Sequence, residues 1–161
     1  MPETRRITTG SPFEKQYGYS RALIREPFIF VAGTTGYDYA GMRMPEDVGA
    51  QTHNIWKTIG ETLAQADASL GDLVRATIYL TDAGDAGTVL PICGQYMGKA
   101  APAASCVIVA GLIDPAMKVE IEVTAMRLRA SRNLAVGHRP HLGIWRFAAC
   151  RLSRPSSVAP A

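Results

Sequence analysis

The chain has 161 residues, of which 47% are hydrophobic and 19% charged, so it is long and apolar enough to bury one globular core and is not a disordered, collagen-like or coiled-coil chain. Its net charge of +3 is unevenly spread, because residues 1–126 hold ten Lys or Arg and all fourteen acids, whereas residues 127–161 hold seven Arg and no acid. The most apolar stretch, residues 101–113, is too short to cross a bilayer, so we expect no membrane span.

The first half of the chain predicts a hairpin followed by a helix. The opening sequence MPETRRITTG lacks the apolar core of a secretory signal. Residues 19–24 and 28–33 are rich in β-branched and aromatic residues and predict two antiparallel strands. A loop rich in Gly, Thr and Tyr follows, and the spacing of apolar residues over 46–66 then predicts an amphipathic helix.

The second half predicts three further strands and a second helix. Residues 74–80 alternate between apolar and polar and predict a strand with one covered face. Residues 86–97 predict a helix that either begins near Pro91 or kinks there. Residues 104–110 and 118–127 predict the last two strands. The order β-β-α-β-α-β-β indicates an α+β domain in which one sheet packs on two helices.

The C-terminal segment differs in composition from the rest of the chain. We predict a domain over residues 1–127 and a basic extension over residues 128–161, disordered or loosely packed rather than an arm for nucleic acid. The three cysteines form no CxxC pair, which favours a reducing compartment over a disulfide framework or a structural zinc site. We therefore expect a cytoplasmic protein that does not bind a metal.

The last predicted strand carries the most informative chemistry. Its alternation places Glu120 and Glu122 on the face opposite to its apolar residues, where the two carboxylates must be solvated or paired. The strand at 104–110, which we expect to lie beside it, carries the thiol of Cys106. A carboxylate and a thiol on adjacent strands would line a small pocket. In the absence of a nearby His, Cys106 is better explained as a small apolar residue than as a nucleophile.

Several segments of the chain resemble the YjgF/RidA family, also called endoribonuclease L-PSP. They occur in the family's order and spacing between about Arg5 and Arg127, and residues 128–161 have no counterpart. The segments are Gly18-Tyr19-Ser20, Phe30-Val31-Ala32-Gly33-Thr34, Ala68-Ser69-Leu70-Gly71-Asp72-Leu73-Val74, Pro102-Ala103-Ala104-Ser105-Cys106-Val107 and Val119-Glu120-Ile121-Glu122.

The resemblance implies a fold, an assembly and a reaction. The fold would be chorismate-mutase-like, of the bacillus type, and three copies would form a barrel with small-molecule clefts between subunits. Active members are implied to hydrolyse reactive imines and enamines to ketoacids and ammonia without a cofactor. Glu120 corresponds to the glutamate that positions or activates water. The substrate-binding positions correspond to Tyr19, Gly33, Ala104, Ser105 and Cys106.

One departure from the family pattern bears on the substrate. The family strand normally reads Pro-Ala-Arg-Ser-Cys-Val, and its arginine is implied to bind the substrate carboxylate, but this chain has Ala104 there. Arg21, Arg25 or Arg43 would have to supply the missing positive charge, and nothing in the sequence places any of them in the cleft.

Three functions therefore remain open. The first is a hydrolytic deaminase with an altered substrate, in which Glu120 acts as the catalytic base. The second is a trimeric protein that binds a small ligand without catalysis and serves a regulatory role. The third, an endoribonuclease or translation inhibitor, would need a basic surface that only residues 127–161 could provide, so we do not expect a nucleic-acid partner.

Overall fold

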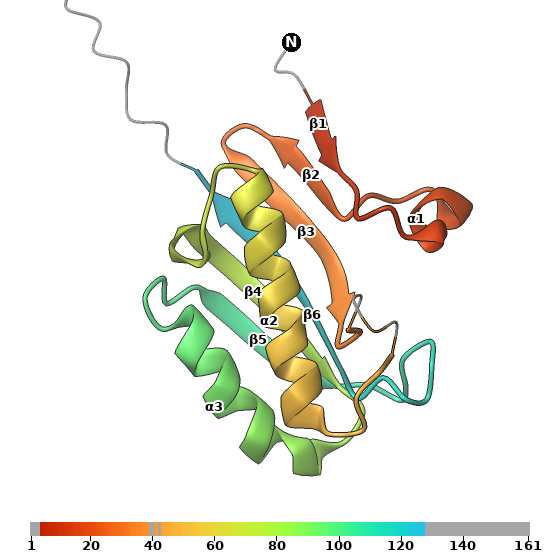
Figure 1. Cartoon of the computed structure of the whole chain (residues 1–161). Helices are drawn as coiled ribbons and strands as arrows, with labels where there is room; N and C mark the ends of the chain where they lie inside the picture. The colour runs from red at the N-terminus through yellow and green to blue at the C-terminus, as the bar shows by residue number, and fades with distance from the viewer. Residues whose placement is uncertain (1–3, 39–40, 42, 128–161) are drawn as a thin grey trace, which may run out of the picture. The chain divides into compact units, whose positions relative to one another are not determined.

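Six strands form one mixed sheet in the computed structural model, which describes residues 4–38, 41 and 43–127 (Figure 1). The strand order is β1-β2-β3-β6-β4-β5. The β4 and β5 strands run parallel, and every other neighbouring pair is antiparallel. The strands are β1 (Thr4–Ile7), β2 (Ala22–Arg25), β3 (Phe28–Thr35), β4 (Leu73–Leu80), β5 (Ala103–Ile108) and β6 (Val119–Met126).

Two long helices, α2 (Val48–Gln65) and α3 (Ala86–Met97), lie on the same face of the sheet (Figure 1). The N-terminus of α2 is capped by Asp47, whose carboxylate accepts a hydrogen bond from the Ala50 backbone N–H at 2.6 Å. The α3 helix begins five residues before Pro91, so the alternative that it starts at the proline is wrong. Shorter elements are α1 (Pro12–Tyr17), η1 (Leu70–Asp72) and η2 (Ala83–Asp85).

The core lies between these helices and the apolar face of the sheet. On α2, the side chains of Ile55, Trp56, Ile59 and Leu63 are fully buried, as the periodicity predicts. Facing them are alternate residues of the central strands, namely Ile29, Val31, Ala76, Ile78, Leu80, Val119, Ile121, Val123 and Ala125. The predicted α+β arrangement of one sheet on two helices is confirmed.

Two elements of the fold, the strand β1 and the short helix α1, were not predicted. The first strand, β1, has the sequence TRRI, whose charged residues carry no strand pattern, and it forms because it pairs with β2. The expectation that residues 104–110 lie beside the last strand is wrong. Among the described strands β5 pairs with β4 alone, and β6 lies between β3 and β4. The predicted extension over residues 128–161 lies outside the described residues.

A buried amide holds the start of β6 against α2. The Gln51 side chain is fully buried and donates from Nε2 to the carbonyl oxygens of Pro45, at 2.7 Å, and Ala116, at 2.8 Å. Its Oε1 accepts a hydrogen bond from the Lys118 N–H at 3.0 Å. These three bonds fix the segment that leads into Val119. In the described part of the chain, no helix is long and apolar enough to span a membrane.

We expect Gln51→Ala to lower the free energy of unfolding by about 3 kcal/mol, because it removes a fully buried side chain and leaves three partly buried backbone groups without their partner. Urea denaturation followed by circular dichroism measures this change. The matched control is Gln65→Ala, which removes an exposed side chain from the same helix and should change stability by less than about 0.5 kcal/mol. Equal effects of the two substitutions would contradict the role given to Gln51.

Candidate functional site

The face of the sheet opposite to α2 and α3 carries the candidate site. Because side chains alternate along β6, its buried apolar residues face the helices and Glu120, Glu122 and Thr124 face the other way. None of the helices in the described residues covers this second face, on which the Phe28 and Phe30 side chains are 40% and 43% exposed. Charged and aromatic groups therefore share one open surface.

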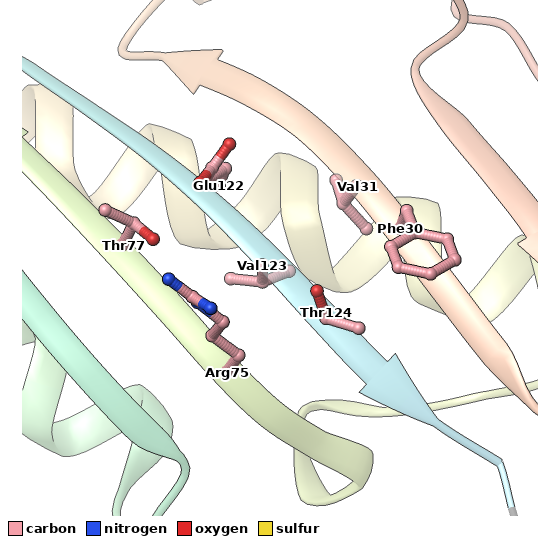
Figure 2. Close-up of a pocket in the computed structure, with 7 residues that line it drawn as sticks. All are labelled: Phe30, Val31, Arg75, Thr77, Glu122, Val123 and Thr124. Atoms are coloured by element: carbon pink, nitrogen blue, oxygen red, sulfur yellow. The ribbon is translucent and has the colours of Figure 1, made fainter.

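A shallow hollow of about 270 Å³ lies in this open face (Figure 2). Figure 2 shows Arg75 and Thr77 on β4, Glu122 on β6 and Phe30 on β3 around it. Beside the hollow, the Tyr79 hydroxyl donates to Glu122 Oε1 at 3.1 Å. Sequence reasoning missed Arg75, Thr77 and Tyr79, although their alternation along the predicted strand 74–80 already placed them on one face. The remaining lining residues are Val31, Val123 and Thr124.

Glu120 lies directly against the backbone of Gly33. A Cβ atom at Gly33 would be 2.0 Å from Glu120 Oε1 and 2.9 Å from its carboxyl carbon, so any side chain there would displace the carboxylate. Glycine is required by this close approach, and not by its φ angle. The structure thus brings together Gly33 and Glu120, two residues that the sequence proposed for one site.

The surroundings of Glu120 favour its protonated form. Burial raises the pKa of the Glu120 carboxyl above its ordinary value, the carboxylate of Glu122 raises it further, and the Arg21 guanidinium opposes both. Glu120 is half-buried and retains access to solvent. A raised pKa brings the carboxyl closer to the range in which it can both accept and donate a proton near neutral pH.

The raised pKa also ties stability to pH. Because the folded-state pKa of Glu120 lies above its unfolded-state value, the folded chain binds this proton more tightly. The stability that Glu120 contributes is therefore complete below the unfolded-state pKa and is lost as the pH rises through the folded-state pKa.

Arg21, Arg25 and Arg43 were considered as replacements for the arginine that the family has at position 104. All three make contacts elsewhere in the chain. Arg21 is 3% exposed, and its Nη1 donates to the Gly33 carbonyl at 3.0 Å and to Thr34 Oγ1 at 3.2 Å. Arg25 donates to Thr4 Oγ1 at 2.9 Å, at the far end of β2, and the exposed Arg43 pairs its backbone with Asp38. The Nη1 group of Arg21 is therefore hydrogen-bonded within the protein, to Gly33 and Thr34.

The remaining candidate residues lie two strands away from Glu120, on the exposed edge strand β5. In register, Ala104 is opposite Ala76 and Cys106 is opposite Ile78, so both side chains point toward the helix side of the sheet. Ser105 is opposite Thr77 and points toward the open face. The expected pocket shared by Cys106 and Glu120 on adjacent strands is therefore wrong within one copy of the chain.

The six proposed residues thus form two groups. Tyr19, which is 39% exposed, precedes β2 at the end where Gly33 lies, because the Ala32 N–H donates to the carbonyl oxygen of Arg21. Tyr19, Gly33 and Glu120 make one group, and the residues of β5 make the other. Partial burial raises the pKa of the Cys106 thiol, which disfavours the thiolate that a nucleophile would need. In the described residues no three metal-ligating side chains gather.

We expect Gly33→Ala to rotate the Glu120 carboxylate into solvent and to lower its pKa toward the ordinary value. Because the clash involves the end of a flexible side chain, the free energy of unfolding should fall by less than about 1.5 kcal/mol. Carbon-13 NMR titration of the glutamate carboxyls measures the pKa, and urea denaturation measures the stability.

Gly36→Ala is the matched control for Gly33→Ala. A Cβ at Gly36 would meet the Gln51 backbone Cα at 2.5 Å, an atom that cannot rotate away. This variant should therefore lose more stability, by about 2–3 kcal/mol. An unchanged Glu120 pKa in Gly33→Ala would contradict the contact described above.

Comparisons with known proteins identify the family. A model of the endoribonuclease L-PSP family matches residues 9–127. Rv2704 of Mycobacterium tuberculosis, a member of the YjgF/YER057c/UK114 family, is 39% identical, with a TM-score of 0.71 over 78% of this chain and 100% of that one. The 2-iminobutanoate/2-iminopropanoate deaminase of Bos taurus is 33% identical over 110 residues, which are 68% of this chain and 80% of the bovine protein. The chain therefore belongs to the YjgF/RidA family, also called endoribonuclease L-PSP.

Proposed function

We propose that this protein is a cofactor-independent deaminase that hydrolyses a small imine or enamine to a carbonyl compound and ammonia. The observation that carries the proposal is the half-buried carboxyl of Glu120, whose pKa is raised and which rests against Gly33. The similarity of the chain to the 2-iminobutanoate/2-iminopropanoate deaminase of Bos taurus supports the same reaction class.

The proposed reaction needs one water molecule and one proton-transferring group. Water adds to the carbon of the C=N bond, and Glu120 accepts a proton from that water as the C–O bond forms. The carboxyl then returns the proton to nitrogen, which gives a carbinolamine. The ionised carboxylate next takes the proton of the new hydroxyl group and passes it to nitrogen as the C–N bond breaks, which releases ammonia, leaves a C=O group and regenerates the carboxylate. A carboxyl with a raised pKa suits these steps, because it is a stronger base when ionised and remains an acid when protonated.

The substrate differs from that implied for the family's active members. The methyl group of Ala104 cannot bind a carboxylate, and Arg21 Nη1 is hydrogen-bonded within the protein. We therefore propose an imine without a carboxylate group. Glu120 and Glu122 share the open face with Arg75, and the excess of carboxylates in this set would favour a neutral or protonated imine over an anionic one.

A cleft shared between copies of the chain would complete this site. We propose a homotrimer, because Tyr19, Gly33 and Glu120 lie apart from the β5 residues within one chain. The open face, with Phe28, Phe30 and part of Val107 exposed, offers apolar area for a second copy to cover. The cytoplasmic location expected from the sequence stays a prediction.

Ala104 also favours a second candidate function. A cleft that keeps Tyr19, Gly33 and Glu120 but lacks the family's arginine could bind a small ligand without turning it over. The protein would then be a trimeric binding or regulatory protein. Ammonia release distinguishes the two functions, because only the deaminase produces it.

The first test measures ammonia release from enzymatically generated imines with and without a carboxylate group. Wild type should act on imines without a carboxylate, and Glu120→Gln should lower kcat/KM by at least about 100-fold because the proton-transferring group is lost. Retention of the wild-type rate in Glu120→Gln would contradict the mechanism. Absence of ammonia from every substrate would favour the binding protein.

Ala104→Arg in the same assay tests the substrate class. It should gain activity toward carboxylated imines, because a guanidinium can bind a carboxylate through two hydrogen bonds. The matched control is Ala103→Arg, which adds the same group one residue earlier and on the opposite side of β5. Equal gains in both variants would mean that added charge, and not its position, changes the substrate.

A second test concerns the assembly. Sedimentation analysis should give three times the mass of one chain for wild type. Phe30→Glu should yield folded monomers, because it adds a charge to an exposed position on the open face. The control is Ala64→Glu, which adds the same charge to the exposed side of α2 and should leave the trimer intact. A monomeric wild type would contradict the shared cleft.

A further inference from the structure

Glu14 and Arg21 form an ion pair that is almost entirely shielded from solvent. Their side chains are 5% and 4% exposed, and Arg21 Nε lies 3.8 Å from Glu14 Oε1. Buried ion pairs contribute little net stability compared with apolar residues of the same size, because desolvation offsets the attraction. Such a pair is therefore better explained by what it positions than by what it stabilises.

The carboxylate of Glu14 is held firmly on its own side of the pair. The Thr9 N–H donates to both carboxylate oxygens at 3.1 Å, and the Thr9 hydroxyl donates to Oε1 at 2.7 Å. These three hydrogen bonds hold the Glu14 carboxylate in one position. A fixed negative charge thus lies beside Nε of Arg21, which has no hydrogen-bond partner among the described residues.

The other end of Arg21 is bonded to the part of β3 that lies against Glu120. Nη1 donates to the Gly33 carbonyl and to Thr34 Oγ1, and the Thr34 hydroxyl donates to the Ala32 carbonyl at 3.0 Å. The register between β3 and β6 shifts between Val31 and Thr34, so the regular ladder does not fix this segment. The Arg21 guanidinium supplies the missing restraint.

Gly33 connects Arg21 to Glu120. Because Gly33 has no side chain, the Glu120 carboxylate rests in the space that a Cβ atom would fill. Among the described residues, the charged or ionisable groups that act on Glu120 are Glu122 on the same strand, Tyr79 on β4 and Arg21, which is bonded to β3. Arg21 is the cation in this set. It is placed to act on Glu120 through both the position of Gly33 and its own charge.

We propose that Arg21 is a positioning residue for Glu120, held by Glu14, which fixes the Gly33–Thr34 segment against which the Glu120 carboxylate rests. The inference rests on the proposed function, in which Glu120 transfers the proton. It assigns to a buried arginine a role that differs from contact with substrate, since Arg21 is shielded from solvent and acts through its hydrogen bonds to Gly33 and Thr34.

The test is a carbon-13 NMR titration of Glu120, which needs no substrate. Arg21→Gln removes the cation and should raise the pKa of Glu120 by about one unit. Arg21→Lys keeps the charge and should restore a value close to wild type. Arg25→Gln is the matched control, since it removes an exposed arginine from the far end of the same region and should leave the pKa unchanged. Glu122→Gln should lower the pKa, which shows that the titration responds to a neighbouring charge.

Glu14→Gln is a second variant, which tests the same proposal if Arg21→Gln does not fold. It preserves the shape of the side chain but removes the negative charge that partly offsets Arg21, so the pKa of Glu120 should fall. A purely structural pair would give lower melting temperatures in both variants with the Glu120 pKa unchanged, and that result would overturn the proposal.

Activity provides a separate readout. If the wild type releases ammonia, the acidic limb of its pH profile should move to higher pH in Arg21→Gln, in step with the NMR pKa. A shifted pKa with an unmoved pH profile would overturn the positioning role. Failure of the deaminase proposal itself would appear as a wild type that releases no ammonia, while the titration still decides whether Arg21 controls the ionisation of Glu120.

Discussion

The two-residue period of β6 is the constraint on which both the core and the site depend. It directs Val119, Ile121 and Val123 toward the helices, and it directs Glu120 and Glu122 toward the open face. A slip of one residue would bury two carboxylates and expose three apolar side chains. The hydrophobic core therefore fixes where the carboxylates point, and the hydrogen bonds of Gln51 fix where the strand begins.

The position of Glu120 is defined by backbone as much as by side chains. On one side β6 carries it, and on the other side the irregular segment of β3 presents Gly33, where no Cβ is in the way. This arrangement excludes part of the solvent from the carboxyl and raises its pKa, while access from the open face remains. A group that must exchange protons with a substrate needs both conditions.

Periodicity predicted the elements whose pattern is strong, and it failed where the pattern was absent. The helix over 46–66 and the last strand were predicted because their apolar residues repeat at helical and strand spacing. The TRRI strand and the short α1 helix lack such a repeat and depend on tertiary pairing. Strand order was equally beyond a local pattern, so Cys106 was expected beside Glu120 although β4 separates their strands. The burial of Arg21 has no local signal either.

The separation of the two groups of site residues has a chemical consequence for any reaction at this sheet. In the proposed reaction Glu120 would transfer a proton on the open face of one copy, whereas the β5 strand proposed to hold the ligand lies across β4, on the exposed edge. If a neighbouring copy brings its edge strand to this carboxylate, the groups that bind and the group that reacts come from different chains. Substitutions at position 104 could then alter the choice of ligand without moving Glu120. In the proposed cleft, the core would thus fix the carboxylate of one copy, and the edge strand of another would set the choice of ligand.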